Sequence, residues 1–380
     1  MNVGISTSVI QRGKSGVAQY VFSLVFQLLP FAKRHQFILF ILEDDLPLFR
    51  FAELDMKIVR VPERFRPPLK NIGWHQTALP RLARDLRIDV LHVPSYRRML
   101  WRKPCALVTT IHDLAPFHVA GKYDWMRMFY GRVVAKRLAR RQDEIIAVSR
   151  NTGQDILRFF RIPEERLEIV HNGVDHTRFF PGSRGDAKST IAVRHGLNRP
   201  FFLYIARLEH PGKNHVRLIE AFNRFKSETK SDWQLVFGGT DWHGAGVIHS
   251  AIRQSPFAGD IHCKGFIPES DLPTWYRAAD VFVYPSLFEG FGLPPVEAMA
   301  CGCPVISSTR GALAEITGMA SATVDPEDVH SIQLQMTRLA TNPNLCEYLR
   351  AAGLERANYF DWKRAAAETM EVYKRAARRS

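Results

Sequence analysis

The sequence predicts an α/β protein made of two Rossmann-like, doubly wound domains. Its 380 residues exceed what one hydrophobic core usually supports, and 46% of them are hydrophobic, which is enough for two globular cores. Short apolar segments typical of buried strands alternate with helical patterns in two separate series. This alternation is typical of parallel sheets that are covered by helices.

The first series of expected strands lies in the first half of the chain. Each segment is short and rich in β-branched or aromatic residues, and helical patterns at residues 16–29 and 74–86 lie between several of them. The expected strands cover residues 2–6, 37–42, 57–61, 89–93, 107–111, 144–148 and 167–170.

The second series follows a stretch with linker composition. Residues 180–186 read Phe-Pro-Gly-Ser-Arg-Gly-Asp, which places a boundary near residue 180. We therefore expect an N-terminal domain over residues 1–180, a second domain over residues 181–359, and a closing helical segment over residues 360–380. The strands expected in the second domain cover residues 201–205, 234–237, 261–264, 280–284, 304–307 and 322–324.

Two glutamates eight positions apart, Glu289 and Glu297, flank a glycine-bearing loop in the second domain. Glu289 comes after the expected strand at 280–284, at the edge where open α/β sheets bind ligands. Gly290 and Gly292 allow backbone N–H groups to approach a ligand closely. Two successive prolines then suit the start of a helix, so we expect Glu297 in its first turn, facing the same crevice as Glu289.

This combination suits a nucleotide sugar. A helix start favours a phosphate, and a carboxylate accepts hydrogen bonds from sugar hydroxyls. A solvated strand–turn–helix connection would account for any one of these residues, but not for the whole run.

The run from Phe288 to Ala300 resembles the donor-site motif of the retaining glycosyltransferases of family 4, which include bacterial mannosyl- and glucosyltransferases. Both glutamates stand in order with Phe-Gly-Leu-Pro at 291–294 and Glu-Ala-Met-Ala at 297–300. The resemblance implies the GT-B architecture, in which two Rossmann-like domains face a central cleft and a C-terminal helix crosses back to the first domain. It is strong from about residue 144 onward and local around residue 112.

A basic motif follows the first expected strand of the second domain. Arg207 and Lys213 lie within residues 204–214, directly after the strand at 201–205. The Arg and Lys of this motif bind the donor diphosphate in the family, so the resemblance implies that role here. Two fixed cations would stabilise the charge that develops on the leaving diphosphate.

The resemblance also assigns the ribose and the sugar of the donor. Glu297 should bind the ribose. Glu289, counted as catalytic, should hold the transferred sugar together with the backbone of Phe291, Gly292 and Leu293.

Phe266 lies in a turn after the expected strand at 261–264. The resemblance implies that the backbone around Phe266 holds the nucleotide base. A hydrophobic turn that packs Phe266 into the core is the alternative.

In the first domain, His112 and Asp113 follow the expected strand at 107–111. The mannosyltransferases of the family have a histidine here beside the transferred sugar, so the resemblance implies a catalytic role for His112. A purely structural histidine is the alternative. Asp113 is expected to orient the loop.

A glycine loop near the start of the chain is expected to contact the donor. A P-loop is excluded because Ser8 stands where that pattern requires glycine. The resemblance places Gly16 in the loop that cradles the donor phosphate or the acceptor. Two residues separate Gly13 from Gly16 here, whereas the family often has adjacent glycines.

These motifs predict a retaining hexosyltransferase that moves a hexose from a nucleoside diphosphate sugar to a hydroxyl group. The context of His112 and the run from Glu289 to Ala300 are most similar to the mannosyltransferases, so we expect mannose from GDP-mannose. A UDP-sugar remains the alternative donor. The sequence contains no Asp-x-Asp triplet, and the resemblance implies a metal-independent enzyme without a cofactor.

The net charge of +14 belongs mainly to the first domain. Residues 1–180 hold 29 Lys and Arg against 17 Asp and Glu, whereas the remainder holds 23 against 21. Basic clusters at 60–70, 97–103 and 125–141 include Trp, Met and Leu, which suits an anionic membrane surface; solvated basic faces are the alternative. We expect the acceptor to be a saccharide linked to polyprenyl diphosphate, in polysaccharide or glycolipid biosynthesis.

No apolar stretch reaches the length of a membrane span, and the first residues do not form a signal peptide. We therefore expect a cytoplasmic protein, peripheral on the inner face of the plasma membrane. Two other classes stay open. A nucleic-acid-binding protein would explain the charge, although no known nucleic-acid-binding signature occurs, and we expect no nucleic-acid partner. A sugar-nucleotide epimerase would need a similar nucleotide site.

Overall fold

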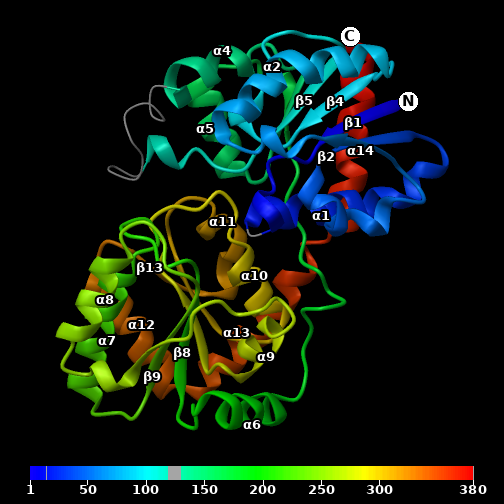
Figure 1. Cartoon of the computed structure of the whole chain (residues 1–380). Helices are drawn as coiled ribbons and strands as arrows, with labels where there is room; N and C mark the ends of the chain where they lie inside the picture. Colours follow the sequence, from blue (N-terminus) through cyan, green and yellow to red (C-terminus); the bar gives the residue numbers. More distant parts are fainter. Residues whose placement is uncertain (14, 119–129, 380) are drawn as a thin grey trace. The chain divides into compact units, whose positions relative to one another are not determined.

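The computed structural model describes residues 1–13, 15–118 and 130–379, which form two compact units (Figure 1). The first unit contains the described residues up to Phe117, those from 130 to Gly173, and those from Trp362 onward. The second unit contains His118 and the residues from Val174 to Asp361.

The division between the units differs from the expected boundaries at 180 and 359. The backbone N–H of Val174 donates to the carbonyl of Phe360 over 3.1 Å, and Nε2 of His176 donates to the same carbonyl over 3.1 Å. These bonds attach residues 174–176 to the second unit, so the linker composition near residue 180 lies inside this unit rather than at its start.

The first unit is built on a seven-stranded sheet in which every pair of neighbours is parallel. The strand order is β3-β2-β1-β4-β5-β6-β7, so the order reverses between β1 and β4. The strands are β1 (Asn2–Ser6), β2 (Gln36–Leu42), β3 (Lys57–Val61), β4 (Val90–Val93), β5 (Ala106–Ile111), β6 (Glu144–Ala147) and β7 (Leu167–Ile169).

Helices cover both faces of this sheet (Figure 1). The α-helices are α1 (Gly16–Leu28), α2 (Pro68–Asp85), α4 (Lys136–Ala139), α5 (Arg150–Phe160) and α14 (Trp362–Arg379). The short helices are η1 (Gln11–Gly13), η2 (Leu29–Lys33), η3 (Glu43–Ala52), η4 (Glu63–Phe65), η5 (Tyr96–Arg98), η6 (Ala115–Phe117), η7 (Tyr130–Ala135) and η8 (Glu164–Arg166).

The C-terminal helix α14 belongs to the first unit, as the resemblance implied. Val372 and Tyr373 are fully buried in one core with Val21 and Leu24 of α1. Burying these side chains stabilises the unit by roughly 1.5–3 kcal/mol for each large apolar group. The helix is therefore part of the core of the first unit and not an appendage.

A buried carboxylate also holds α14. Glu144 at the start of β6 is completely buried, and its Oε1 lies 3.3 Å from Nη1 of Arg379. Nη2 of Arg375 lies 3.6 Å from Oε2 of Glu144 and 2.6 Å from Oε2 of Glu168. Burial raises the pKa of Glu144 and the two guanidinium groups oppose that rise. The two cations thus compensate a buried charge at the end of the helix.

The second unit has a six-stranded parallel sheet with the order β10-β9-β8-β11-β12-β13. Its strands are β8 (Phe201–Ile205), β9 (Gln234–Gly238), β10 (Ile261–Cys263), β11 (Val281–Tyr284), β12 (Val305–Ser308) and β13 (Ala322–Val324). Its helices are α6 (Arg184–His195), α7 (His215–Thr229), α8 (Ala245–Gln254), η9 (Ala258–Asp260), α9 (Leu272–Ala278), α10 (Leu293–Ala300), α11 (Leu313–Thr317), η10 (Gly318–Ala320), α12 (Val329–Thr341) and α13 (Pro343–Asn358).

The two expected sheets are present, and the strands lie within one residue of their expected bounds. The second helix differs, because α2 begins at Pro68 and not at residue 74. A proline suits the start of a helix, because its missing N–H would have no partner there. The first turn of α2 is exposed at Leu69 and Lys70, so it does not show the apolar periodicity from which the helix was predicted. Residues 125–129 of the basic cluster at 125–141 lie outside the described residues, and most of its remainder forms η7 and α4.

Candidate active site

The strand order of the second unit reverses between β8 and β11, and open α/β sheets bind ligands beyond the carboxyl ends of the strands at such a point. Arg207 and Lys213 follow β8, and Glu289 follows β11. The two predicted donor motifs therefore lie on either side of the switch point.

Lys213 and Glu289 form an ion pair, although the sequence assigned them to different parts of the donor. Nζ of Lys213 donates to Oε1 of Glu289 over 2.6 Å. The same oxygen accepts hydrogen bonds from Ser286 Oγ at 2.6 Å and from Tyr284 Oη at 3.2 Å. Burial lowers the pKa of Lys213, but the attraction of Glu289 outweighs it, so the pKa is raised and the lysine stays charged.

The loop that carries Lys213 is fastened by buried hydrogen bonds. Tyr204 Oη donates to the carbonyl of Lys213 over 2.6 Å. Asn214 has the left-handed φ of 63° and donates from Nδ2 to the carbonyls of Pro285 and Pro326, over 2.9 and 2.6 Å. The ammonium group is therefore held on a rigid loop, as electrostatic stabilisation of a transition state requires.

Arg207 is more exposed and lies on an aromatic ring that the sequence prediction missed. Its guanidinium carbon is 4.6 Å from the ring centroid of Trp242, and its Nη2 is 3.8 Å from a carboxylate oxygen of Glu209. The Trp242 side chain follows β9 and is itself exposed. A large exposed aromatic residue shortly after the Gly-Gly pair at 238–239 was the available signal.

Gly239 allows the loop after β9 to approach the loop after β8 closely. Gly239 has a φ of +148°, and a Cβ built there would lie 1.9 Å from the carbonyl oxygen of Ala206. Any side chain at residue 239 would displace the backbone next to Arg207. The Gly-Gly pair thus has a structural reason tied to the position of Arg207.

Glu297, the second glutamate of the motif, lies further from the start of its helix than expected. Helix α10 begins at Leu293 with Gly292 as its N-cap, at a left-handed φ of +99°, so Glu297 is the fifth helical residue and lies beyond the first turn. Its Oε2 accepts a hydrogen bond from Tyr276 Oη at 2.9 Å. Burial raises the pKa of Glu297 to about 7, while the Tyr276 bond opposes the rise.

The remaining donor residues differ in exposure. Phe266 is 64% exposed and Ile267 is the buried residue of this turn, so the interpretation of Phe266 as a core residue is wrong. Phe291 is buried against Phe360, with ring centroids 5.4 Å apart. Leu293 is partly buried at the first position of α10.

In the first unit, His112 follows β5 and lies partly buried. Its Nε2 is 3.2 Å from the carbonyl oxygen of Pro94, which follows β4. Burial lowers the pKa of His112 to about 4, with Asp113 opposing this shift, so the imidazole is neutral at pH 7. Asp113 accepts from the N–H of Ala115 over 2.9 Å, which fits its expected role in orienting the loop.

Gly16 is the first residue of α1, after the N-cap Ser15, whose hydroxyl accepts from the N–H of Ala18. A Cβ built at Gly16 would meet no described atom within 4 Å. The loop before α1 follows β1, which borders the switch point of the first sheet. Gly16 and His112 thus belong to the first unit, and the other predicted site residues belong to the second.

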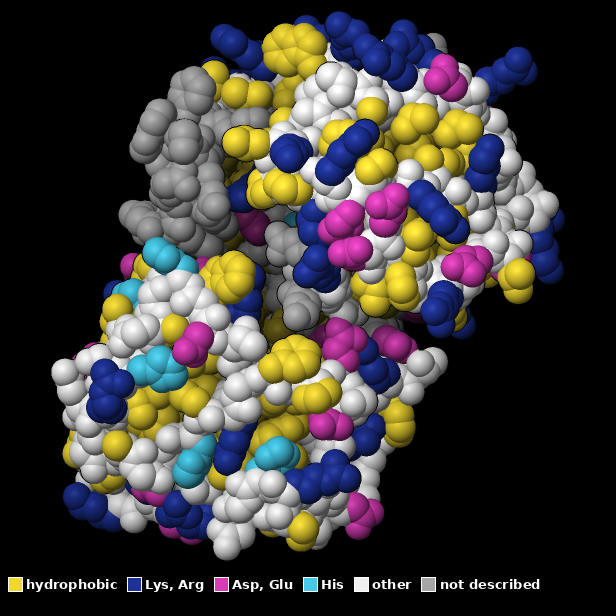
Figure 2. Space-filling model, in the orientation of Figure 1, with side chains coloured by type: hydrophobic (Ala, Val, Ile, Leu, Met, Phe, Trp, Pro, Cys, Tyr) yellow, Lys and Arg dark blue, Asp and Glu magenta, His cyan; other side chains and the backbone are white. Residues whose placement is uncertain are grey.

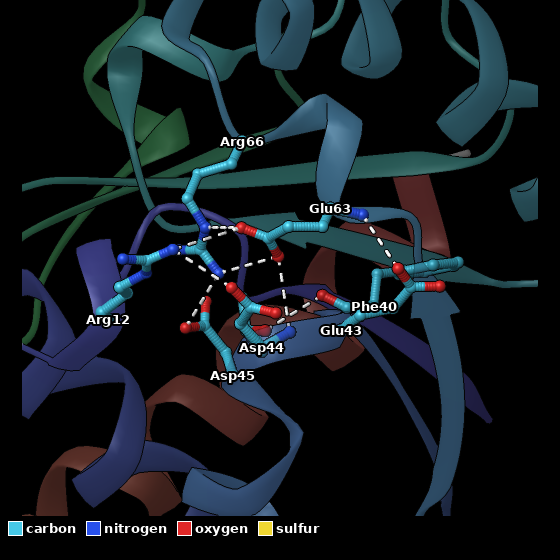
Figure 3. A network of polar contacts seen from close by, with 8 residues as sticks. Arg12, Phe40, Glu43, Asp44, Asp45, Glu63 and Arg66 are labelled. Atoms are coloured by element: carbon cyan, nitrogen blue, oxygen red, sulfur yellow. Dashed lines mark hydrogen bonds and ion pairs between the residues drawn. The ribbon is translucent and has the colours of Figure 1, made fainter.

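Charged side chains anchor the loop before Gly16 (Figure 3). Nη2 of Arg12 lies 3.1 Å from Oδ2 of Asp44 and 3.9 Å from Oε1 of Glu63. Arg66 pairs with Glu63 and lies 3.1 Å from the buried Asp45. Arg12 has a left-handed φ of 57°, so its side chain holds a turn that is costly for a residue other than glycine.

Within the described ranges, no group of three or more His, Cys, Asp or Glu side chains could hold a metal ion. In the same part of the chain, no helix is both long and apolar enough to cross a membrane.

Family profiles match both units. Residues 14–178 match the profile described as Glycosyltransferase Family 4, and residues 188–356 match the one described as Glycosyl transferases group 1.

Two characterised relatives are mannosyltransferases by name. The chain is 30% identical over 294 residues to O-antigen chain mannosyltransferase B of Escherichia coli, covering 77% of this chain and 75% of the relative. It is 33% identical over 259 residues to MMP alpha-(1->4)-mannosyltransferase of Mycolicibacterium hassiacum, covering 67% of this chain and 59% of the relative.

Solved structures agree in fold. Sucrose-phosphate synthase from Thermosynechococcus elongatus superimposes with a TM-score of 0.80 at 21% identity, covering 100% of both chains. HepE of Anabaena, in complex with UDP and glucose, superimposes with a TM-score of 0.77 at 18% identity, covering 98% of both chains. The fold and the relatives define a glycosyltransferase of the GT-B fold. The chain belongs to glycosyltransferase family 4.

Proposed function

We propose that the protein transfers mannose from GDP-mannose to a hydroxyl group of a saccharide acceptor, with retention of the anomeric configuration. The observation that carries this proposal is the rigid Lys213–Glu289 pair at the switch point of the second sheet, with Arg207 after the same strand, β8, as Lys213. The mannosyl specificity is supported by the names of the relatives, which include O-antigen and MMP alpha-(1->4)-mannosyltransferases.

The charged pair suits the departure of a diphosphate. An ammonium group has three N–H donors, so Lys213 can keep its bond to Glu289 and still donate to a phosphate oxygen. Arg207 adds a planar guanidinium, which binds phosphate oxygens in pairs. Both cations would stabilise the leaving group as the glycosidic bond breaks, while Glu289 and the backbone of residues 291–293 hold the sugar.

The remaining residues act on the ribose, the base and the sugar. Glu297 would bind the ribose hydroxyls, since Tyr276 holds one carboxyl oxygen in place. The backbone around Phe266 would hold the base, and Gly16 leaves room for a phosphate or the acceptor at the start of α1. His112 would contact the sugar. No cofactor or metal ion takes part in this proposal.

We expect GDP and GDP-mannose to raise the melting temperature more than UDP, ADP or their sugars do. A ligand that binds only the folded protein stabilises it by RT ln(1+[L]/Kd), or about 2.7 kcal/mol at 100 times Kd. Arg207→Ala should lose most of this shift, and the exposed Arg224→Ala of α7 should keep it. EDTA should leave the GDP shift unchanged.

A UDP-specific shift would select the alternative donor, and no shift with any nucleotide would exclude the donor site. Incubation with GDP-mannose alone should give only slow hydrolysis of the donor. Conversion of the donor to a different nucleotide sugar would instead indicate an epimerase. The proton spectrum of the glycoside product reports the anomeric configuration, and an inverted product would contradict retention.

The acceptor is proposed to be a saccharide on polyprenyl diphosphate, with the protein bound peripherally to the inner face of the plasma membrane. In Figure 2, Lys and Arg side chains gather over the first unit next to apolar side chains. Trp101 is 47% exposed beside Arg102, and the guanidinium carbon of Arg141 lies 4.4 Å from its ring centroid. A cationic surface with an exposed indole suits an anionic bilayer.

The protein should sediment with vesicles that contain anionic lipid, and this binding should weaken as salt rises because counterions screen the attraction. The double variant Trp101→Ala/Arg102→Glu should bind several-fold less, at roughly 1 kcal/mol per lost basic residue. Arg253→Glu makes the same change of charge on α8 of the second unit and should not affect binding. Equal binding to neutral vesicles would contradict the proposal, and a gel shift with nucleic acid would support the alternative partner.

A further inference from the structure

A chain of buried hydrogen bonds crosses the first unit and ends beside His112. Tyr373 Oη on α14 is 2.8 Å from Nδ1 of His92, and Nε2 of His92 is 2.8 Å from Oγ1 of Thr110. Oγ1 of Thr110 is in turn 2.9 Å from Oη of Tyr20 on α1. All members belong to the first unit, and the mechanism proposed above uses none of them.

Tyr20 is the member that touches the candidate catalytic histidine. Its ring centroid is 4.7 Å from that of His112 at an interplanar angle of 80°, an edge-to-face contact. Only 2% of Tyr20 is exposed, and Trp362 of α14 contacts its ring at 5.8 Å. With its hydroxyl on Thr110, two residues before His112, Tyr20 ties α1 to the strand that carries the histidine.

The second contact of His112 identifies its tautomer. A carbonyl oxygen can only accept, so Nε2 must carry the proton in the bond to Pro94. Burial lowers the pKa of His112, so the ring carries a single proton at pH 7 and Nδ1 is a hydrogen-bond acceptor. Within the described residues of the first unit, Nδ1 of His112 makes no hydrogen bond.

We propose that Tyr20 is a positioning residue that holds the His112 ring on the Pro94 carbonyl, so that Nδ1 accepts a hydrogen bond from a hydroxyl of the transferred sugar. The proposal rests on the proposed function of His112 as a sugar contact. It assigns His112 the role of a neutral acceptor and excludes the role of a general acid. Tyr20 lies one helical turn after Gly16, so a single helix positions both predicted site residues of the first unit.

The tautomer can be read directly from the nitrogen shifts of the imidazole. In the whole protein labelled with 15N-histidine at pH 7.5, the His112 signals are those lost in His112→Gln. We expect a protonated-type shift at Nε2 and an unprotonated-type shift at Nδ1. Protonation at Nδ1, or at both nitrogens, would overturn the proposal whether or not the protein transfers mannose.

Variants at Tyr20 separate positioning from packing. Tyr20→Leu removes the ring, so we expect a mixture of tautomers at His112 and a kcat lowered about tenfold, since a small misplacement at the reacting centre is costly. Tyr20→Phe keeps the ring and should retain most of kcat and the Nε2–H tautomer. The Kd for GDP should change little in either variant, because most of its proposed contacts, including Arg207, Lys213 and Glu297, belong to the second unit.

Phe22→Leu is the matched control, because Phe22 lies on the same helix but contacts Phe49, at 5.1 Å, and not His112. It should leave both the tautomer and kcat unchanged. A Tyr20→Leu protein with unaltered His112 shifts and unaltered kcat would refute the positioning role. If the His112 nitrogen shifts are as expected but neither the native protein nor any variant transfers mannose, the proposed function is refuted instead.

Discussion

Replacing Lys213 with Met lowers kcat for donor turnover by about 10²–10³-fold, the usual effect of removing one preorganised donor from a developing negative charge. The same change leaves the partly buried Glu289 without its cation, 2.6 Å away in the native protein. Breaking such a pair costs about 3 kcal/mol of unfolding free energy, which is the lower end of the range for fully buried pairs. Release of GDP from GDP-mannose and urea unfolding measure the two effects.

The double variant Lys213→Met/Glu289→Gln distinguishes the two roles of Lys213. Neutralising the carboxylate removes the unpaired charge, so the double variant should recover much of the lost stability. It should recover none of the activity, because the cation at the diphosphate is still missing and the carboxylate proposed to hold the sugar has been neutralised. Recovery of activity together with stability would contradict both the role of Lys213 at the diphosphate and that of the Glu289 carboxylate at the sugar.

Mild acid destabilises the first unit strongly. Burial lowers the pKa of His75 and of His92 to about 3, and that of His112 to about 4. The unfolded chain takes up protons near pH 6.5, whereas the folded unit stays neutral at these positions. Their contribution to stability is therefore complete above about pH 6.5 and is lost as the pH falls towards the folded pKa values. Between pH 7 and 5 each such histidine costs about 2 kcal/mol.

Urea unfolding at pH 7 and pH 5 tests this dependence. His92→Gln should make the fall in unfolding free energy between these pH values smaller by the contribution of one histidine, about 2 kcal/mol. His330→Gln on α12 is the control and should leave the dependence unchanged, because the His330 side chain is exposed in the folded protein. Burial raises the pKa values of Asp45 and Glu144, so these carboxyls act in the opposite direction as the pH falls. A stability that is equal at pH 7 and pH 5 would contradict the neutral buried state of the histidines.

The strands could be predicted because a strand buried on both faces is apolar along its whole length. Strand β8 is of this kind, and residues 201–205 have the predicted bounds in the structure. The edge strands β3 and β13 also have the predicted bounds, although Lys57, Arg60 and Thr323 are exposed. The 3-10 helix η3 was not predicted, since Pro47 and its acidic first turn resemble a loop. The unit boundary was misplaced for a related reason: composition locates flexible-looking residues, whereas the boundary depends on which core the segment after Gly173 contacts.

The site was predictable where one short segment holds the chemistry. Glu289 and Arg207 follow their strands as expected, because a motif after a parallel strand must lie at its carboxyl end. The pairing of Lys213 with Glu289 joins residues 76 positions apart, and no local pattern encodes it. Trp242 and Tyr276 were missed for the same reason, since an aromatic residue shows its role only once its neighbour in space is known.

The place of α14 in the first unit also governs the order in which the protein folds on the ribosome. The second unit is almost continuous in sequence from Val174 to Asp361, so it can close its core as soon as that stretch has emerged. The first unit starts earlier but lacks Val372 and Tyr373 until the end of the chain is made, and until then the part of its core that α14 covers stays open. We therefore expect chains that end near Asp361, once released from the ribosome, to have a folded second unit and an open, chaperone-dependent first unit.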